Sequence, residues 1–256
     1  MSICHRLRRF IPALMYATLA AMAPAAHAWD WNWDWGGKSV KGSGVIKNET
    51  RNVTGFTRIA VSIPAKVEVI QGDTEGITIE GDDNIVPLIE TVVENDGLKI
   101  RLAGKNMSIS TRILRLVVNA RIIEGLSVAG DGDLHAAKLR STTLKASIAG
   151  SGNVNIASLD VDKLTVSIAG SGNFAAGGKA KSIETKIAGS GDIKIGKLEA
   201  DVVKASVAGS GDAIVWAKES LTVSVAGSGD VKYYGDAKVS QSVAGSGSVK
   251  RLGSAP

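Results

Sequence analysis

Cysteine and histidine are nearly absent from this sequence of 256 residues. The one cysteine is Cys4, and of three histidines only His135 lies beyond residue 27. Zinc sites draw on several Cys and His side chains, and a disulfide framework needs paired cysteines. A Cys/His metal site and a disulfide scaffold are therefore excluded, and a Ser-His-Asp triad would have to use His135 as its base.

Apolar runs long enough to cross a membrane are also lacking. A spanning helix needs about 20 apolar residues, and the run from Phe10 to Ala23 is shorter. Three arginines precede this run and Ala26-His27-Ala28 follows it, which is the pattern of a secretory signal. We predict that residues 1–28 are a cleaved signal peptide and that the mature chain is exported and has no transmembrane segment.

The chain has no strong charge of either sign once the signal is set aside. It carries 30 Lys and Arg against 25 Asp and Glu, a formal charge of +5. The signal contains Arg6, Arg8 and Arg9 and no acid, so the mature chain is left with a charge of +2. A surface this close to neutral lacks the basic patch with which nucleic-acid-binding proteins contact the phosphate backbone.

Aromatic residues make up only 4% of the chain, whereas its 30 glycines all lie beyond residue 28. The glycines recur in an Ala-Gly-Ser-Gly-Asp/Asn motif or a close variant of it. Its seven copies are spaced 20, 20, 19, 20, 18 and 18 residues apart and begin at Ala129, Ala149, Ala169, Ala188, Ala208, Ala226 and Ala244. Glycine supplies the positive φ of tight corners, so the glycine excess serves regular turns.

Segments that alternate apolar and polar residues flank each copy, as in Leu164-Thr165-Val166-Ser167-Ile168, and this alternation is typical of strands. Such a short unit buries its apolar face only by stacking on its neighbours. The sequence therefore predicts an all-β fold, a parallel β-helix or β-solenoid with rungs of about 18–20 residues. A β-propeller is the alternative, but its blades need about 40 residues.

Three segments follow the signal in this interpretation. Residues 29–41 form a Trp-rich N-terminal segment with a Gly36-Gly37 hinge. Residues 42–123 alternate without a clean repeat and are predicted to form irregular first rungs. Residues 124–252 are predicted to form the regular solenoid with seven glycine turns.

A known family has a similar arrangement of motifs. Gly42-Ser43-Gly44, Gln71-Gly72-Asp73, the stretch 77–87, Gly97-Leu98-Lys99-Ile100 and the later repeats resemble the DUF2807 family, the putative autotransporter adhesin head, GIN domain. The resemblance covers roughly residues 42–250. It implies a β-helical, adhesin-like protein exported to the periplasm or cell surface of a bacterium, and it implies no particular activity.

An Asp or Asn follows the last glycine of six copies. This column comprises Asp133, Asn153, Asn173, Asp192, Asp212 and Asp230. One interpretation is a calcium ladder, but calcium-binding β-rolls have a nine-residue repeat with the Asp two places after the glycine. We favour a structural turn ladder in which each side chain accepts backbone N–H groups at its corner. No metal, cofactor or catalytic residue is predicted.

A column of small residues is predicted to point outward beside the corners. It comprises Ser147, Ala149, Ser167, Ala169, Ala188, Ser206, Ala208, Ser224 and Ala226, and Lys186 interrupts it. One explanation, which stays open, is that the corner itself requires small residues. The alternative is an interaction face for an extended ligand or for another protomer, with a trimer as one closed homo-oligomer.

Four tryptophans alternate along the Trp-rich segment: Trp29, Trp31, Trp33 and Trp35. Such residues suit contact with sugar rings or a membrane interface. We favour a strand or tail that covers the exposed core at an end of the solenoid.

These observations predict an exported, non-enzymatic β-solenoid of the cell envelope that acts as an adhesin-like or scaffolding module. Its predicted partner is an envelope protein or a glycan. The alternative is a carbohydrate-binding or polysaccharide-processing β-helix protein, because fold alone does not decide function.

Overall fold

Strands account for most of the described residues. The structure is a computed structural model that describes residues 38–104 and 106–256. The predicted signal peptide and the four tryptophans of the Trp-rich segment lie outside the described residues.

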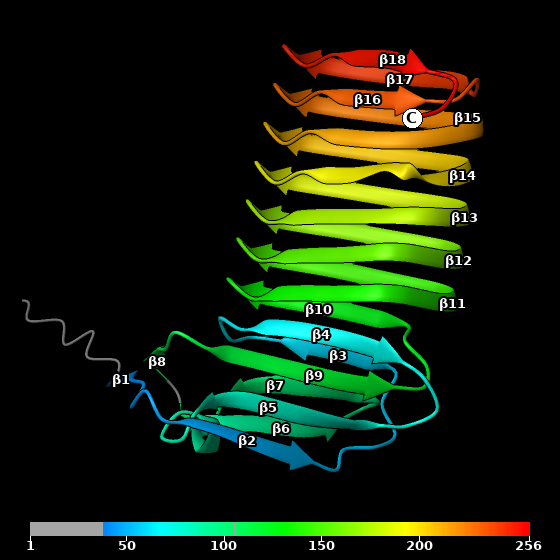
Figure 1. The fold of residues 1–256 in the computed structure, drawn as a ribbon. Coiled ribbons are helices and arrows are strands. Elements are labelled where there is room, and N and C mark those ends of the chain that lie inside the picture. The colour runs from blue at the N-terminus through cyan, green and yellow to red at the C-terminus, as the bar shows by residue number, and fades with distance from the viewer. Residues whose placement is uncertain (1–37, 105) are drawn as a thin grey trace, which may run out of the picture. The chain divides into compact units, whose positions relative to one another are not determined.

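A regular stack of parallel rungs begins at β10 (Gly125–Gly130) and confirms the predicted all-β solenoid (Figure 1). Each following rung is one long strand that runs from one glycine corner to the next. These strands are β11 (Asp133–Gly150), β12 (Asn153–Gly170), β13 (Asn173–Gly189), β14 (Ile193–Gly209) and β15 (Ala213–Gly227). The next rung is divided between β16 (Val231–Tyr234) and β17 (Lys238–Gly245), and β18 (Val249–Gly253) ends the stack.

Neighbouring rungs pair in parallel so that equivalent positions of the repeat stack on one another. The alanines that open the corners show this register, since they are successive partners in the order Ala149, Ala169, Ala188, Ala208, Ala226 and Ala244. Each outward side chain therefore repeats at the strand spacing of about 4.8 Å.

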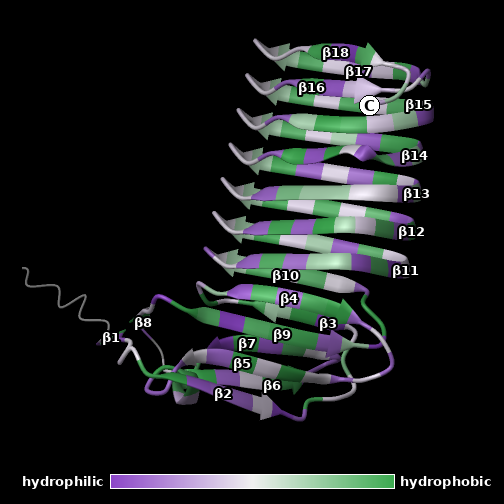
Figure 2. Ribbon diagram, in the orientation of Figure 1, coloured by the Kyte–Doolittle hydropathy of each residue, from purple (hydrophilic) through white to green (hydrophobic). Residues whose placement is uncertain are grey.

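Alternate side chains of each rung point into the stack, and the banding of apolar and polar residues along the strands is visible in Figure 2. In β12 the buried apolar side chains are Val154, Ile156, Leu159, Val161, Leu164, Val166 and Ile168. Their equivalents in adjacent rungs lie directly above and below, which makes one continuous apolar core. Removal of this apolar surface from water is the main force that holds the rungs together.

The strands before β10 form two more parallel layers. β3 (Arg58–Val61) pairs with β10, and β4 (Lys66–Gln71) pairs with β11. β7 (Gly97–Leu102) and β9 (Leu114–Ala120) pair in turn with β3 and β4. The parallel stack thus continues below the regular repeats, although the chain between these strands does not follow the repeat.

Beyond these layers the pairing becomes antiparallel, which the predicted irregular rungs did not include. β5 (Gly76–Asp82) pairs with β9, β2 (Ile46–Arg51) with β5, and β6 (Ile89–Glu94) with β7. The physical reason is clearest between β6 and β7. Asn95 and Asp96 both adopt positive φ, +49° and +59°, as a two-residue hairpin turn requires, and such a turn joins only antiparallel strands.

Two smaller features complete this part of the chain. A 3-10 turn, η1 (Val86–Leu88), precedes β6 and contains Pro87. β1 (Lys38–Lys41) pairs in parallel with β8 (Met107–Ser110) in a separate two-stranded sheet.

The first glycine of each regular corner adopts a conformation that other residues disfavour. Its φ is +120° at Gly150, +126° at Gly170 and +132° at Gly189. The carbonyl oxygen of this glycine accepts two hydrogen bonds from the next corner. Ser171 N–H and Gly172 N–H, for example, donate to Gly150 O over 2.9 and 3.0 Å. The corners are therefore bonded to one another directly.

The second glycine of each corner is required by close stacking. A Cβ placed on Gly172 would lie 2.2 Å from Gly152 O and 2.5 Å from Ile148 Cγ2. A Cβ on Gly191 would lie 2.1 Å from Gly172 O. Since the nearest obstacle is backbone, a side chain here would force neighbouring rungs apart.

We expect Gly172→Ala to lower the free energy of unfolding by about 3 kcal/mol, because overpacking against fixed backbone is among the costlier core changes. Ser171→Ala is the matched control, since Ser171 is exposed in the same corner, and we expect it to change stability by less than about 0.5 kcal/mol. Denaturant unfolding followed by circular dichroism measures both. Equal stability of the two variants would contradict the stacking constraint.

Candidate interaction surfaces

The Asp/Asn column forms a hydrogen-bonded ladder along the corners. In its first rungs the side chains bond to each other: Asn153 Nδ2 donates to Asp133 Oδ1 over 2.8 Å, and Asn173 Nδ2 donates to Asn153 Oδ1 over 2.9 Å. From Asn173 onward, each Oδ1 accepts the backbone N–H of the equivalent residue one rung on. The donors, at 2.8–3.2 Å, are Asp192, Asp212, Asp230 and Ser248.

The donors in this ladder differ from those that the sequence analysis expected. It placed the N–H groups within the same corner, whereas the structure places them one rung on. In-register stacking places the equivalent N–H of the next rung about one strand spacing away from each Asp or Asn, within reach of its short side chain. Within residues 38–104 and 106–256, no group of three His, Cys, Asp or Glu side chains is arranged to hold a metal ion. The purely structural role of the ladder remains a prediction.

The small-residue column points outward from the rungs. Its alanines are exposed, whereas the residue before each of them is buried, as Ile148 is before Ala149. Lys186 interrupts the column, and its Nζ pairs with Glu184 Oε1 at 2.9 Å. The structure thus stacks the predicted residues in register on successive rungs, and their use as an interface remains a prediction.

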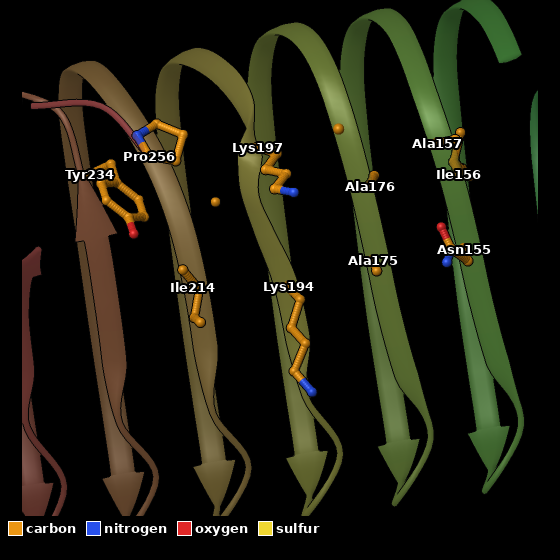
Figure 3. A pocket seen from close by; sticks show the side chains of 12 residues that line it. Asn155, Ile156, Ala157, Ala175, Ala176, Lys194, Lys197, Ile214, Tyr234 and Pro256 are labelled. Atoms are coloured by element: carbon orange, nitrogen blue, oxygen red, sulfur yellow. The ribbon is translucent and has the colours of Figure 1, made fainter. Parts of the chain in front are cut away.

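A groove that the sequence analysis missed crosses the rungs on the face formed by the first half of each long strand. Its volume is about 490 Å³. Figure 3 shows Asn155 of β12 at one end, Lys194 and Lys197 of β14 in the middle, and Tyr234 of β16 with Pro256 at the other end. The groove is therefore built from residues on successive rungs that lie far apart in the sequence.

The groove lies where the rungs lose their regular register. Pairing shifts at the positions Ile156/Leu159 in β12, Ala175/Gly177 in β13 and Lys194/Glu199 in β14. The rungs also shorten, from 18 residues in β12 to 15 in β15. Bulges of this kind are common beside functional sites because they redirect side chains. In the sequence, the signals were the shorter repeats after residue 208 and the Ala-Ala-Gly-Gly run at 175–178.

Several residues of the N-terminal motif form a hydrogen-bond network. Gly44 N–H donates to Asp82 Oδ1 over 2.7 Å, and Ser43 N–H donates to Asn84 Oδ1 over 3.0 Å. Asp82 is only 4% exposed, and the Thr111 hydroxyl donates to its second oxygen. This network holds the segment after β1 against the end of β5, which explains the presence of these motif residues structurally.

The four tryptophans and His135 are the other residues that the sequence brought forward. Trp29, Trp31, Trp33 and Trp35 lie outside the described residues. His135 is exposed in β11, with Glu68 of β4 and Asn155 of β12 as its register neighbours. In the part of the chain that the structure describes, no helix is long and apolar enough to span a membrane.

Residues 55–237 match DUF2807, the family described as "Putative auto-transporter adhesin, head GIN domain". Because the match spans well over half of the sequence, the chain belongs to this family. The resemblance stated from the motifs is thereby confirmed.

Solved bacterial structures share the fold. A putative adhesin from Bacteroides fragilis NCTC 9343 is 29% identical with a TM-score of 0.80, over 83% of this chain and 100% of its own. A putative lipid binding protein from Parabacteroides distasonis ATCC 8503 is 24% identical with a TM-score of 0.72, over 84% and 100%. A putative adhesin from Parabacteroides merdae ATCC 43184 is 21% identical with a TM-score of 0.67, over 84% and 99%. A comparison with curated proteins found no match.

The last corner allows the ladder to be tested by titration. The Ser248 hydroxyl and the Ser248 N–H donate to Asp230 Oδ1 over 2.8 and 2.9 Å and lower the pKa of that carboxyl below its usual 3.8. We expect Ser248→Ala to raise the pKa of Asp230 toward 3.8, because it removes the hydroxyl donor. Ser246→Ala, in the same corner, is the control and should leave that pKa unchanged. NMR titration of the carboxyl carbon measures it.

The sign of the stability effect follows from the lowered pKa. The stabilisation is fully present above pH 3.8 and is lost as the pH falls through the lower pKa of folded Asp230. An identical Asp230 pKa in the wild type and in Ser248→Ala would show that the hydroxyl bond does not form in solution.

The small-residue face predicts self-association. We expect Ala188→Glu combined with Ala208→Glu to convert an oligomer into a folded monomer, because the two exposed sites are register partners and would place two carboxylates on the contact. Light scattering measures the mass, and circular dichroism checks the fold. A wild type that is already monomeric at high micromolar concentration would refute the interface.

Proposed function

We propose that the mature chain is an exported, non-enzymatic module of the bacterial cell envelope that acts as an adhesin-like or scaffolding protein. The observation that carries this proposal is the in-register stacking of the rungs. It repeats each outward position about every 4.8 Å and so produces long, regular faces suited to extended partners. Membership of a family described as an adhesin head supports the same role.

Two partly exposed carboxylates, those of Glu94 and Glu184, are paired with lysines and are not suited to act as a general acid. Lys99 lowers the pKa of Glu94, and Lys186 lowers the pKa of Glu184, so both carboxylates are held in the charged form. A general acid at neutral pH needs the opposite shift, a carboxyl with a raised pKa. These carboxylates therefore resemble surface ion pairs more than acid–base machinery.

A carbohydrate-binding function is the second candidate, and the groove favours it. Sugar sites combine an aromatic side chain with a few placed polar groups in a concave surface. Tyr234, Asn155 and the two lysines of β14 provide such a set. Polysaccharide processing would need a catalytic acid and base in addition.

Two measurements test the proposed function. Beads coated with residues 29–256 should be retained on immobilised envelope fragments of the source bacterium, whereas albumin-coated beads should not. The same protein, incubated with a panel of polysaccharides, should release no reducing ends. Equal retention of the two kinds of bead would contradict the adhesin-like role, and release of reducing sugar would overturn the non-enzymatic assignment.

A further inference from the structure

One aromatic side chain, that of Tyr234, lines the groove, and the partly exposed Trp216 is its register partner. Of the Phe, Trp and Tyr residues within 38–104 and 106–256, all except Phe56 lie on β13, β15 and β16. Tyr234 of β16 is partly exposed, as Trp216 of β15 is. Two rings that a core would normally bury are thus presented on neighbouring rungs, and one of them lies at an end of the groove.

Glycine and alanine keep this end of the groove open. A Cβ on Gly196 would lie 2.8 Å from Ile214 Cγ2 and 3.3 Å from Tyr234 Cε2, so the tyrosine ring lies close over a residue without a side chain. Ala157 and Ala175 line the groove nearer its other end. The concave shape therefore depends on small residues at positions that carry larger side chains in other rungs, such as Lys194, the register partner of Ala175.

Two lysines place positive charge in the middle of the groove. Among the described residues, no ion pair includes Lys197, which is exposed in the middle of the groove (Figure 3). Lys194 Nζ lies 3.2 Å from Asp192 Oδ2 but is itself well exposed, and the nearby Glu199 is engaged by Lys218 at 2.9 Å. On the following rungs the successive register partners of Lys194 are Ile214, Lys232 and Lys250, so the same row of side chains contains two further lysines.

We propose that this groove binds an acidic polysaccharide, a chain of uronic acid residues laid across the rungs. A sugar ring packs on Tyr234, carboxylates pair with Lys197 and Lys194, and the Asn155 amide bonds hydroxyl groups. Charge complementarity selects this occupant over a neutral glycan. The open groove with polar groups at both ends suits it better than an acyl chain, which requires an enclosed apolar cavity. The inference deepens the carbohydrate-binding function proposed above and rests on it.

Isothermal titration of residues 29–256 with oligogalacturonate tests the site directly. We expect saturable binding that weakens with added salt, and no binding of maltoheptaose. Tyr234→Ala and Lys197→Ala should each weaken binding about tenfold, as expected for the loss of a charge-assisted or stacking contact. Tyr234→Phe should retain affinity because the ring remains.

Lys204→Ala is the matched control, because Lys204 is an exposed lysine on the same strand but lies beside the small-residue column. We expect it to bind like the wild type, and circular dichroism should show that every variant is folded. The proposal would be overturned if oligogalacturonate did not bind, if Lys204→Ala lost as much affinity as Lys197→Ala, or if maltoheptaose bound equally well. Tyr234-dependent binding of phosphatidylglycerol vesicles in place of the glycan would overturn it as well.

Failure of the groove assignment can be distinguished experimentally from failure of the adhesin-like role. If the coated beads are not retained but oligogalacturonate binds as expected, the adhesin-like role fails and the groove assignment stands. If the beads are retained equally by the wild type and by Tyr234→Ala, and oligogalacturonate does not bind, the groove assignment fails while the adhesin-like role stands.

Discussion

Glycine stacked on glycine at every corner is the contact on which the rest of the structure depends. The second glycine of one corner lies so close to the carbonyl of the corner below that no Cβ fits between them. The first glycine holds a positive φ and receives two N–H groups from the next corner. These contacts fix both the spacing of the rungs and their register. With the register fixed, every other column of side chains follows.

The ladder and the outward faces are consequences of that register. Identical backbone positions lie one strand spacing apart, so Asp192 accepts the N–H of Asp212, and Asp212 accepts that of Asp230. These bonds offset the repulsion between neighbouring carboxylates, which is about 0.9 kcal/mol for exposed charges at that spacing. The same geometry turns a Ser-x-Ala sequence into a continuous outward column. Where the register slips, between β12 and β15, a different face, formed by the first half of each long strand, becomes concave and the groove appears.

The sequence predicted much of this fold because the determining interactions are local and repeated. The alternation Leu164-Thr165-Val166 assigned inward and outward positions, and the Gly-Ser-Gly corners gave the period. Two features depended on contacts between rungs and were missed. The donors of the Asp/Asn ladder lie one rung on, and the groove combines Asn155 with Tyr234 through pairing shifts that no single repeat encodes. The antiparallel strands near the N-terminus were also missed, since their pairing depends on the Asn95-Asp96 hairpin and on long-range contacts.

Hydrogen exchange of the corner amides tests the central claim most directly. The N–H groups of Ser190, Gly191, Ser210 and Gly211 are donated to the corner before them. Peptides that cover residues 188–192 and 208–212 should therefore exchange as slowly as the buried strands on either side, and all regular rungs should lose protection together. Corners that exchange rapidly, like open surface turns, while the strands stay protected would contradict the account.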